Sequence, residues 1–141
     1  MTPKEYLVQG YKIDQRIESK LAQIQSLNDL ATKATSVMSL VPPSGTRNVH
    51  RMEDTIVKIV DLQEEINRDV DELVDFKREL VGVIKNIGNP EYRTVLELRY
   101  LRFMTWEEIA LEISVNLRHI YRIHDRALRE IKIPKDGTKC H

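Results

Sequence analysis

The chain has 141 residues, of which 41% are hydrophobic and 31% charged, a composition typical of a helix-rich globular protein. Twenty-two basic and 22 acidic side chains give a formal net charge of zero, which excludes nucleic-acid binding through overall charge. Residues 1–90 hold 12 basic and 14 acidic side chains, whereas residues 91–141 hold 10 and 8. Any basic surface must therefore be local, and the C-terminal part of the chain is where we expect it.

The cysteine content and the hydropathy predict the cellular compartment. Cys140 is the single cysteine, so an intrachain disulfide is excluded and nothing indicates an oxidising compartment. The N-terminus is charged within its first few residues, and no apolar run approaches the roughly 18 residues of a membrane span. We expect a cytoplasmic protein, with neither signal peptide nor membrane anchor.

The first 41 residues predict one long helix with an apolar seam. Thr2-Pro3-Lys4-Glu5 forms a capping box, with a proline at the first helical position. From Ile13 onward, steps of three and four residues separate the apolar or small positions, with Lys20 as an interruption. The seam consists of Ile13, Ile17, Ile24, Leu27, Ala31, Ala34, Met38 and Val41.

A second long helix is predicted after a break at Pro42-Pro43-Ser44-Gly45 and a polar loop that extends to His50. It has the same heptad spacing, with Gln63 and Lys77 as polar gaps. Its seam consists of Met52, Ile56, Ile59, Ile66, Val70, Leu73, Leu80, Ile84 and Ile87. The acidic run is assigned to exposed coiled-coil flanks: Asp61, Glu64, Glu65, Asp69, Asp71, Glu72 and Asp75.

Residues 1–88 are therefore predicted to form a long antiparallel helical hairpin, similar to a coiled coil. Additional apolar positions widen the stripe beyond what one pair of helices covers. They are Leu21, Leu30, Val60, Val74 and Val81. We expect the hairpin to form a homodimer or a higher homo-oligomer, or to dock to a partner. The alternative is a monomer whose C-terminal helices fold back onto the hairpin.

Gly88-Asn89-Pro90 marks the predicted domain boundary, with a glycine suited to the left-handed position, a capping asparagine and a helix-starting proline. Three helices are predicted in residues 89–133, at Pro90 to Leu101, Trp106 to Ile113 and Leu117 to Ile131. Residues 134–141 are predicted to form a flexible tail. The predicted fold class is all-α.

The second and third of these helices have the features of a helix-turn-helix. Thr105-Trp106-Glu107-Glu108 is a capping box, and Ala110 is small enough for the two helices to cross closely. The turn is Ser114-Val115-Asn116, in which Val115 is predicted to be buried and Asn116 to cap the next helix. A recognition helix is therefore predicted from Leu117.

Spacing divides this last helix into two faces. The core face is predicted to carry Ile120, Ile123, Ala127, Leu128 and Ile131. From Val115 to Ile133 there are five basic and two acidic residues. Residues near the start of the helix are predicted to contact base edges: Leu117, Arg118, His119, Tyr121 and Arg122. Later ones are predicted to contact phosphates: Arg126, Arg129 and Lys132.

The segments 92–100, 105–110 and 120–131 resemble region four of bacterial sigma factors, over about 42 residues without a gap. That region usually has a glycine at the turn followed by a serine cap, where this chain has Ser114 and Asn116. The whole chain, including Ile13-Asp14-Gln15-Arg16-Ile17, is similar to small phage-encoded proteins of low-GC Gram-positive bacteria, which resemble the ArpU and RinA type regulators of phage late genes.

This resemblance implies a late-gene activator that binds promoter DNA and acts with host RNA polymerase. Two alternatives remain open: a small terminase-like packaging protein, and a polymerase-binding sigma mimic that does not read DNA. The acidic run on the second helix is assigned no catalytic role, and Cys140 and the four histidines lack zinc-site spacing. We therefore expect no enzyme activity, no metal and no cofactor.

Overall fold

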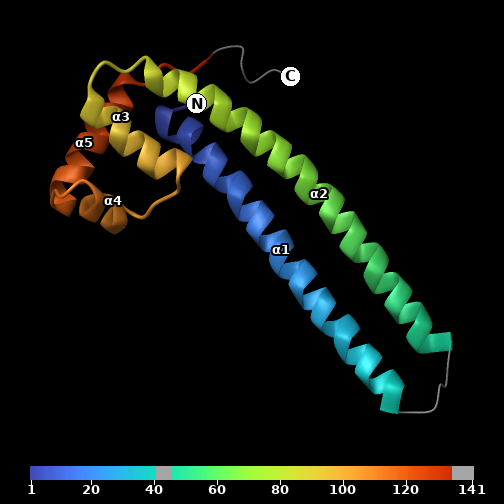
Figure 1. Cartoon of the computed structure of the whole chain (residues 1–141). Helices are drawn as coiled ribbons and strands as arrows, with labels where there is room; N and C mark the ends of the chain where they lie inside the picture. Colours follow the sequence, from blue (N-terminus) through green and yellow to red (C-terminus); the bar gives the residue numbers. More distant parts are fainter. Residues whose placement is uncertain (41–45, 135–141) are drawn as a thin grey trace. The chain divides into compact units, whose positions relative to one another are not determined.

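The computed structural model describes residues 1–40 and 46–134, and in these residues it contains helices and short turns but no strand. The all-α prediction is confirmed. The helices are α1 (Pro3–Leu40), α2 (Thr46–Lys85), α3 (Pro90–Leu96), the π-helix η1 (Glu97–Leu101), α4 (Trp106–Glu112) and α5 (Leu117–Glu130) (Figure 1). The predicted break at residues 42–45 and residues 135–141 of the predicted tail lie outside the described residues.

Two helices begin at the capping residues that the sequence predicts. The backbone N–H of Thr2 donates to Glu5 Oε1 at 2.7 Å, and the backbone N–H of Glu5 donates to Thr2 Oγ1 at 3.1 Å. At the start of α3, the side-chain oxygen of Asn89 accepts from the backbone N–H groups of Glu91 and Tyr92 at 2.8 and 3.3 Å. Both caps satisfy donors that a helix leaves unpaired at its first turn.

Two predicted boundaries are wrong in detail. Helix α2 begins at Thr46, although a loop to His50 was expected. Residues 46–50 are polar apart from Val49 and include neither glycine nor proline, so nothing in them opposes extension of the helix. The helix predicted from Pro90 to Leu101 is α-helical only as far as Leu96 and continues as the π-helix η1.

The last turn of α2 is closed by backbone hydrogen bonds, from the N–H of Asn86 to the carbonyl of Val83 at 3.3 Å and from the N–H of Ile87 to the carbonyl of Ile84 at 3.0 Å. The segment after the helix is held by a side chain and not by a left-handed glycine. Gly88 does not adopt a positive φ. Instead, Arg93 Nη1 donates to the carbonyl oxygens of Ile87 and Gly88 at 2.6 and 3.2 Å. A charged donor from α3 thereby satisfies carbonyl groups that have no partner in the helix.

The chain divides into two compact units. Unit 1 consists of residues 1–13 together with the chain from Glu72 onward, and unit 2 consists of Asp14–Asp71. The predicted domain boundary at residues 88/89 does not coincide with this division. The reason lies in the core of unit 1, which takes side chains from both sides of that boundary.

The core of unit 1 joins the first turns of α1 and the last turns of α2 to the C-terminal helices. Tyr6 and Leu7 are fully buried there, as are Leu80 and Ala127. The other buried members are Val83, Ile84, Ile87, Leu96, Tyr100 and Ile131. Each large apolar side chain buried in this way stabilises the fold by roughly 1.5–3 kcal/mol. The helices after residue 88 therefore share their core with α1 and α2.

Within unit 2, α1 and α2 run antiparallel and face each other along one seam (Figure 1). On α1 the seam positions that are buried or half-buried are Ile17, Lys20, Ile24, Leu27 and Ala31, and Asp14 beside them is also half-buried. On α2 the seam positions are Met52, Thr55, Ile59, Leu62, Ile66 and Asp69, and Glu65 beside them is also half-buried. The predicted seam positions Ile56 and Val70 are wrong, because these side chains are 54% and 40% exposed. The regular spacing passes through the adjacent positions Thr55 and Asp69.

Asp69 is one of two polar residues that meet in this seam. It is only 8% exposed, so its assignment to an exposed flank was wrong. Lys20 Nζ donates to its carboxylate at 2.7 Å and Arg16 Nη2 at 3.3 Å, while Lys20 also lies 3.3 Å from Glu65 Oε1. The hydrogen bond from Lys20 holds the pKa of the Asp69 carboxyl below its ordinary value.

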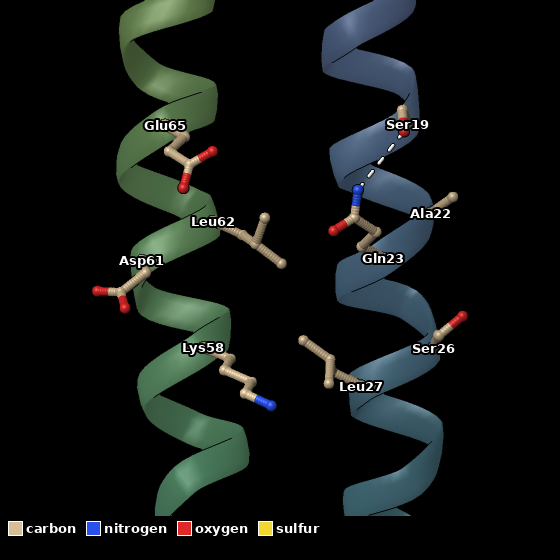
Figure 2. Close-up of a pocket in the computed structure, with 9 residues that line it drawn as sticks. All are labelled: Ser19, Ala22, Gln23, Ser26, Leu27, Lys58, Asp61, Leu62 and Glu65. Atoms are coloured by element: carbon tan, nitrogen blue, oxygen red, sulfur yellow. Dashed lines mark hydrogen bonds between the residues drawn. The ribbon is translucent and has the colours of Figure 1, made fainter.

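A groove of about 720 Å³ runs between the two helices of unit 2. Figure 2 shows Leu27 of α1 and Leu62 of α2 pointing into the space between the helices. The α1 side of the groove carries the small residues Ser19, Ala22 and Ser26. Because these side chains are short, the two helices alone leave this side of the seam open.

Candidate nucleic-acid interface

The turn between α4 and α5 adopts the conformation that a close crossing of two helices needs. Ser114 has a φ of 57°, in the left-handed region where glycine is preferred. The backbone N–H of Val115 donates to the carbonyl of Ala110 at 3.1 Å, and Val115 packs against the apolar cluster that contains Ile109. Ser114 thus takes the left-handed position without the glycine usual at such a turn.

The beginnings of both helices are capped as predicted. For α4, the backbone N–H of Thr105 donates to Glu108 Oε1 at 2.8 Å, and Thr105 Oγ1 accepts from the backbone N–H of Glu108 at 3.1 Å. For α5, the side chain of Asn116 accepts from the backbone N–H of His119 at 2.8 Å. The first turn of α5 is therefore held in place, which fixes the direction of the side chains that follow.

The inward face of α5 is confirmed. Ile120 and Ile123 are buried against Val95, Leu98 and Ile109 of the neighbouring helices. Ala127 and Ile131 are buried in the core described for unit 1, and Leu128 is half-buried against it. The helix is thus held along its whole length, and its rotation about its own axis is determined by these contacts.

The outward face carries most of the residues that the sequence assigns to DNA. Those that are exposed are Arg118, Tyr121, Arg122, Arg126, Arg129 and Lys132. Leu117 and His119, which were also assigned to base edges, are half-buried. Arg118, Arg122 and Arg129 lie four and seven residues apart, so they share one face of the helix. They form a basic ridge centred on the exposed side of α5.

Asp125 also lies on this ridge, between Arg122 and Arg129 in the helical spacing, and it is exposed. A carboxylate in this position repels phosphates but can accept a hydrogen bond from the amino group of a cytosine. Sequence reasoning assigned no role to Asp125. Its position three residues after Arg122 could have indicated that Asp125 lies on the outward face.

His119 is held near the start of α3. Its Nε2 lies 3.9 Å from Glu91 Oε2, and both side chains are partly exposed. Glu91 is in the first turn of α3, where a carboxylate is favourable next to the helix N-terminus. The half-buried position and this neighbour leave His119 less free to reach outward than Arg118.

Trp106 acts as a structural staple at the start of α4. The guanidinium of Arg99 lies 4.4 Å from the centre of its ring, and the His124 ring contacts it edge-on at 4.6 Å. Tyr121 packs against it at 5.6 Å. Arg99 also donates from Nη1 to the carbonyl of Met104 at 2.9 Å. The tryptophan therefore connects η1 and α4 to α5 beneath the exposed face.

Sequence reasoning missed the buried hydrogen bond between Tyr100 and His124. The Tyr100 hydroxyl and His124 Nε2 form a hydrogen bond at 2.6 Å. Burial raises the pKa of Tyr100 to about 12 and lowers the pKa of His124 to about 4, the latter partly opposed by Asp125. The histidine is therefore neutral at physiological pH. Its position four residues after Ile120 is the signal that could have indicated burial.

In residues 1–40 and 46–134, no group of three or more His, Cys, Asp or Glu side chains is placed to hold a metal ion. No helix in the same ranges combines the length and the apolarity needed to cross a membrane. The basic ridge on α5 is the candidate functional site.

Comparison with known proteins gives one match. A family model with the description "Protein of unknown function (DUF1492)" matches residues 32–132, more than half of the chain. No curated protein and no solved structure matches the chain. The matched segment includes α2 through α5 but only the last residues of α1, so it lacks Tyr6 and Leu7, which share a core with α5. The chain therefore belongs to the DUF1492 family.

Proposed function

We propose that this protein is a sequence-specific DNA-binding regulator of transcription. In this proposal α4, the turn and α5 form a helix-turn-helix, and α5 is the recognition helix. The observation that carries the proposal is the basic ridge of Arg118, Arg122 and Arg129 on the exposed face of a helix whose start is capped and whose inner face is fully packed. Because this helix is already ordered, its binding in a major groove does not incur the entropic cost of ordering it.

The proposed roles follow from position along α5. Arg118 and Arg122 are near the N-terminal end, which approaches base edges in this motif, and arginine can donate two hydrogen bonds to guanine. Arg126, Arg129 and Lys132 follow and would contact phosphates. Leu117, His119 and Tyr121 remain proposed base contacts, with Leu117 and His119 the less accessible of the three.

The proposal includes the wider arrangement that the sequence resemblance implies. Helices α1 and α2 form an antiparallel hairpin that oligomerises the protein or docks it to a partner, and residues 89–133 form a module similar to sigma region four. By the same resemblance, the protein is a phage late-gene activator that works at promoters with host RNA polymerase. Double-stranded DNA, RNA polymerase and further copies of the chain are then its partners.

Binding titrations with single-residue variants test the assigned roles. The substrate is a duplex recovered by selection from a random library, together with its single-base variants. Arg118→Ala or Arg122→Ala should lose roughly 1–3 kcal/mol of discrimination at one base position. Arg126→Ala should weaken binding to all duplexes and lower the salt slope by about one. Arg68→Ala, an exposed arginine on α2, is the matched control and should bind as wild type.

The same experiments separate the proposal from its alternatives. If Arg118→Ala and Arg122→Ala weaken binding to every duplex equally, α5 does not read bases. A multi-subunit ring in native mass spectrometry, with binding near a packaging site, would favour a small terminase-like protein. Binding to RNA polymerase without binding to DNA would favour a sigma mimic. Each of these results would contradict the proposed regulator.

A further inference from the structure

Helix α2 carries a second apolar stripe beside its seam with α1. Within unit 2, Ile56, Val60 and Val70 are 54%, 45% and 40% exposed, and Gln63 and Asn67 between them are also exposed. We call Ile56, Val60, Gln63, Asn67 and Val70 the outer stripe. Its members are spaced four, three, four and three residues apart, which is the heptad spacing of a coiled-coil interface. The same spacing continues in sequence at Val74 and Val81.

We infer that the outer stripe is a dimer interface, on which a second copy of this chain packs its own α2 in parallel and in register. In heptad terms Val60, Asn67 and Val74 occupy one core position, and Ile56, Gln63 and Val70 the other. In the first of these positions, Val60 and Val74 flank a single asparagine, and a single asparagine at such a position specifies register and oligomeric state. The surface that matches this pattern is the outer stripe of a second copy of the chain.

Asn67 supports pairing with an identical helix. It lies in the middle of the outer stripe. If this stripe packed only against lipid or an apolar peptide, the Asn67 amide would be buried without a hydrogen-bond partner. In an in-register parallel pair, the two Asn67 side chains meet across the interface and hydrogen-bond to each other. A single asparagine at such a position specifies register and a two-stranded state, at some cost in stability.

Charge distinguishes parallel from antiparallel pairing. Glu64 and Asp71 flank the outer stripe on one side and are exposed. In an antiparallel pair centred on Asn67, Glu64 of one copy would lie beside Asp71 of the other, and the two negative charges would repel. In a parallel pair these carboxylates face the opposite flank of the other helix, which carries Ile59 and Ile66. Parallel pairing avoids the repulsion.

The groove between α1 and α2 is a different surface. Its α2 lining includes Lys58, Asp61 and Glu65, which the helical period places on another side of α2 from the outer stripe. Figure 2 shows these polar side chains along the α2 side of the groove. They have neither the apolar character nor the regular repeat of the outer stripe, so the groove does not provide a comparable interface.

This inference deepens the self-association included in the proposed function, and it can fail separately from DNA recognition. Because the DNA-binding module follows α2 in the chain, parallel pairing starts both copies of the module from the same end of the paired helices. Two modules related by the two-fold axis of the pair would then favour a site made of two inverted half-sites. The experiments below use the full chain without DNA, so their outcome does not depend on base reading.

Cross-linking tests the orientation. In a Cys140→Ser background, Val60→Cys alone should form covalent dimers with a short bis-maleimide, and so should Val74→Cys alone. An antiparallel pair centred on Asn67 would instead place position 60 of one copy beside position 74 of the other. Cross-linking only when the two variants are mixed would therefore overturn the inference, as would no cross-linking in any combination.

Measurements of molecular mass test whether the outer stripe is the dimer interface. By sedimentation equilibrium at micromolar concentration, the wild-type chain should be a dimer and Val60→Glu a monomer, with unchanged helicity by circular dichroism. Leu30→Glu, which changes an exposed apolar residue on α1, is the matched control and should remain a dimer. Asn67→Val should keep association but add species larger than a dimer. A monomeric wild type, or equal dissociation of Val60→Glu and Leu30→Glu, would overturn the inference.

Discussion

Lys20 donates a hydrogen bond from Nζ to the Asp69 carboxylate at 2.7 Å, across the seam between α1 and α2 within unit 2. Both residues occupy positions where the three-four spacing otherwise places apolar side chains. The hydrogen bond raises the pKa of Lys20 and lowers that of Asp69, so both groups stay charged over a wide pH range. The pair therefore aligns the two helices at one register.

Separating this pair should destabilise the protein more than removing both of its members. Asp69→Leu removes the shorter of the two carboxylate contacts of Lys20 and leaves only Glu65, at 3.3 Å, so the melting temperature should fall by a few degrees. Adding Lys20→Leu should restore or exceed wild-type stability, because two leucines then fill the seam. Thermal unfolding by circular dichroism measures both. Asp61→Leu, at an exposed position, is the control for added hydrophobicity, and a double variant less stable than Asp69→Leu would disprove the argument.

Adding a methyl group at Gly10 should be harmful, although alanine is a better helix former. A Cβ at Gly10 would lie 2.9 Å from Phe76 Cε2, and the Phe76 ring is itself packed against Tyr6. We expect Gly10→Ala to lose about 1–2 kcal/mol in urea unfolding. Gly82→Ala in α2 meets nothing within 4 Å and should gain about 0.5–1 kcal/mol. Equal gains at both positions would show that α1 does not approach Phe76 closely.

The turn before α5 should become more stable with glycine. Ser114 has a φ of 57°, a conformation that costs residues with a Cβ roughly 1–2 kcal/mol. Ser114→Gly removes this cost, but part of the gain is lost because glycine has greater conformational freedom in the unfolded chain. The free energy of unfolding should therefore rise by about 0.5–1 kcal/mol. Ser114→Val should lose at least about 1 kcal/mol, since branched side chains oppose this conformation. If glycine and valine had the same effect in urea unfolding, the turn would not be left-handed.

The buried His124 predicts a loss of stability in mild acid. Burial lowers its pKa from 6.5 to about 4, so below pH 6.5 the unfolded chain takes up a proton that the folded chain does not. Stability should decline as the pH falls from 6.5 towards 4, by up to roughly 3 kcal/mol. Urea unfolding at several pH values measures this decline.

His124→Phe is the comparison for this effect, because carboxylates also titrate in acid. The variant loses the hydrogen bond with Tyr100 and should be less stable at pH 7, but its stability should depend less on pH between 6.5 and 5. If the wild type and His124→Phe showed the same slope in this range, His124 would not be held in its neutral form.

The starts of α3, α4 and α5 could be predicted because they depend on neighbouring residues. Asn89, Thr105 and Asn116 each accept hydrogen bonds from backbone N–H groups two or three positions later, and each precedes a helix where the pattern predicts it. The register of α2 could not be predicted in the same way. Hydrophobic spacing favours Val70 over Asp69, and the seam position of Asp69 depends on Lys20, 49 residues earlier in the chain.

The faces of α5 could also be predicted, since a helix with apolar residues at steps of three and four has one inward side. Ile120, Ile123 and Ala127 are buried accordingly. The burial of His124 could not be predicted from hydropathy, because a histidine is buried only where a partner such as Tyr100 satisfies it. The half-burial of His119 depends on α3, which spacing within α5 does not reveal.

The proposal that α5 reads DNA is tested most directly by selection from a random duplex library with the full-length protein. We expect the wild-type chain to enrich one sequence motif, and Arg118→Ala and Arg122→Ala to relax the preference at different positions within it. Arg68→Ala should enrich the wild-type motif. Enrichment of no motif by the wild type, or an unchanged motif with both α5 variants, would contradict the assignment of α5 as the recognition helix.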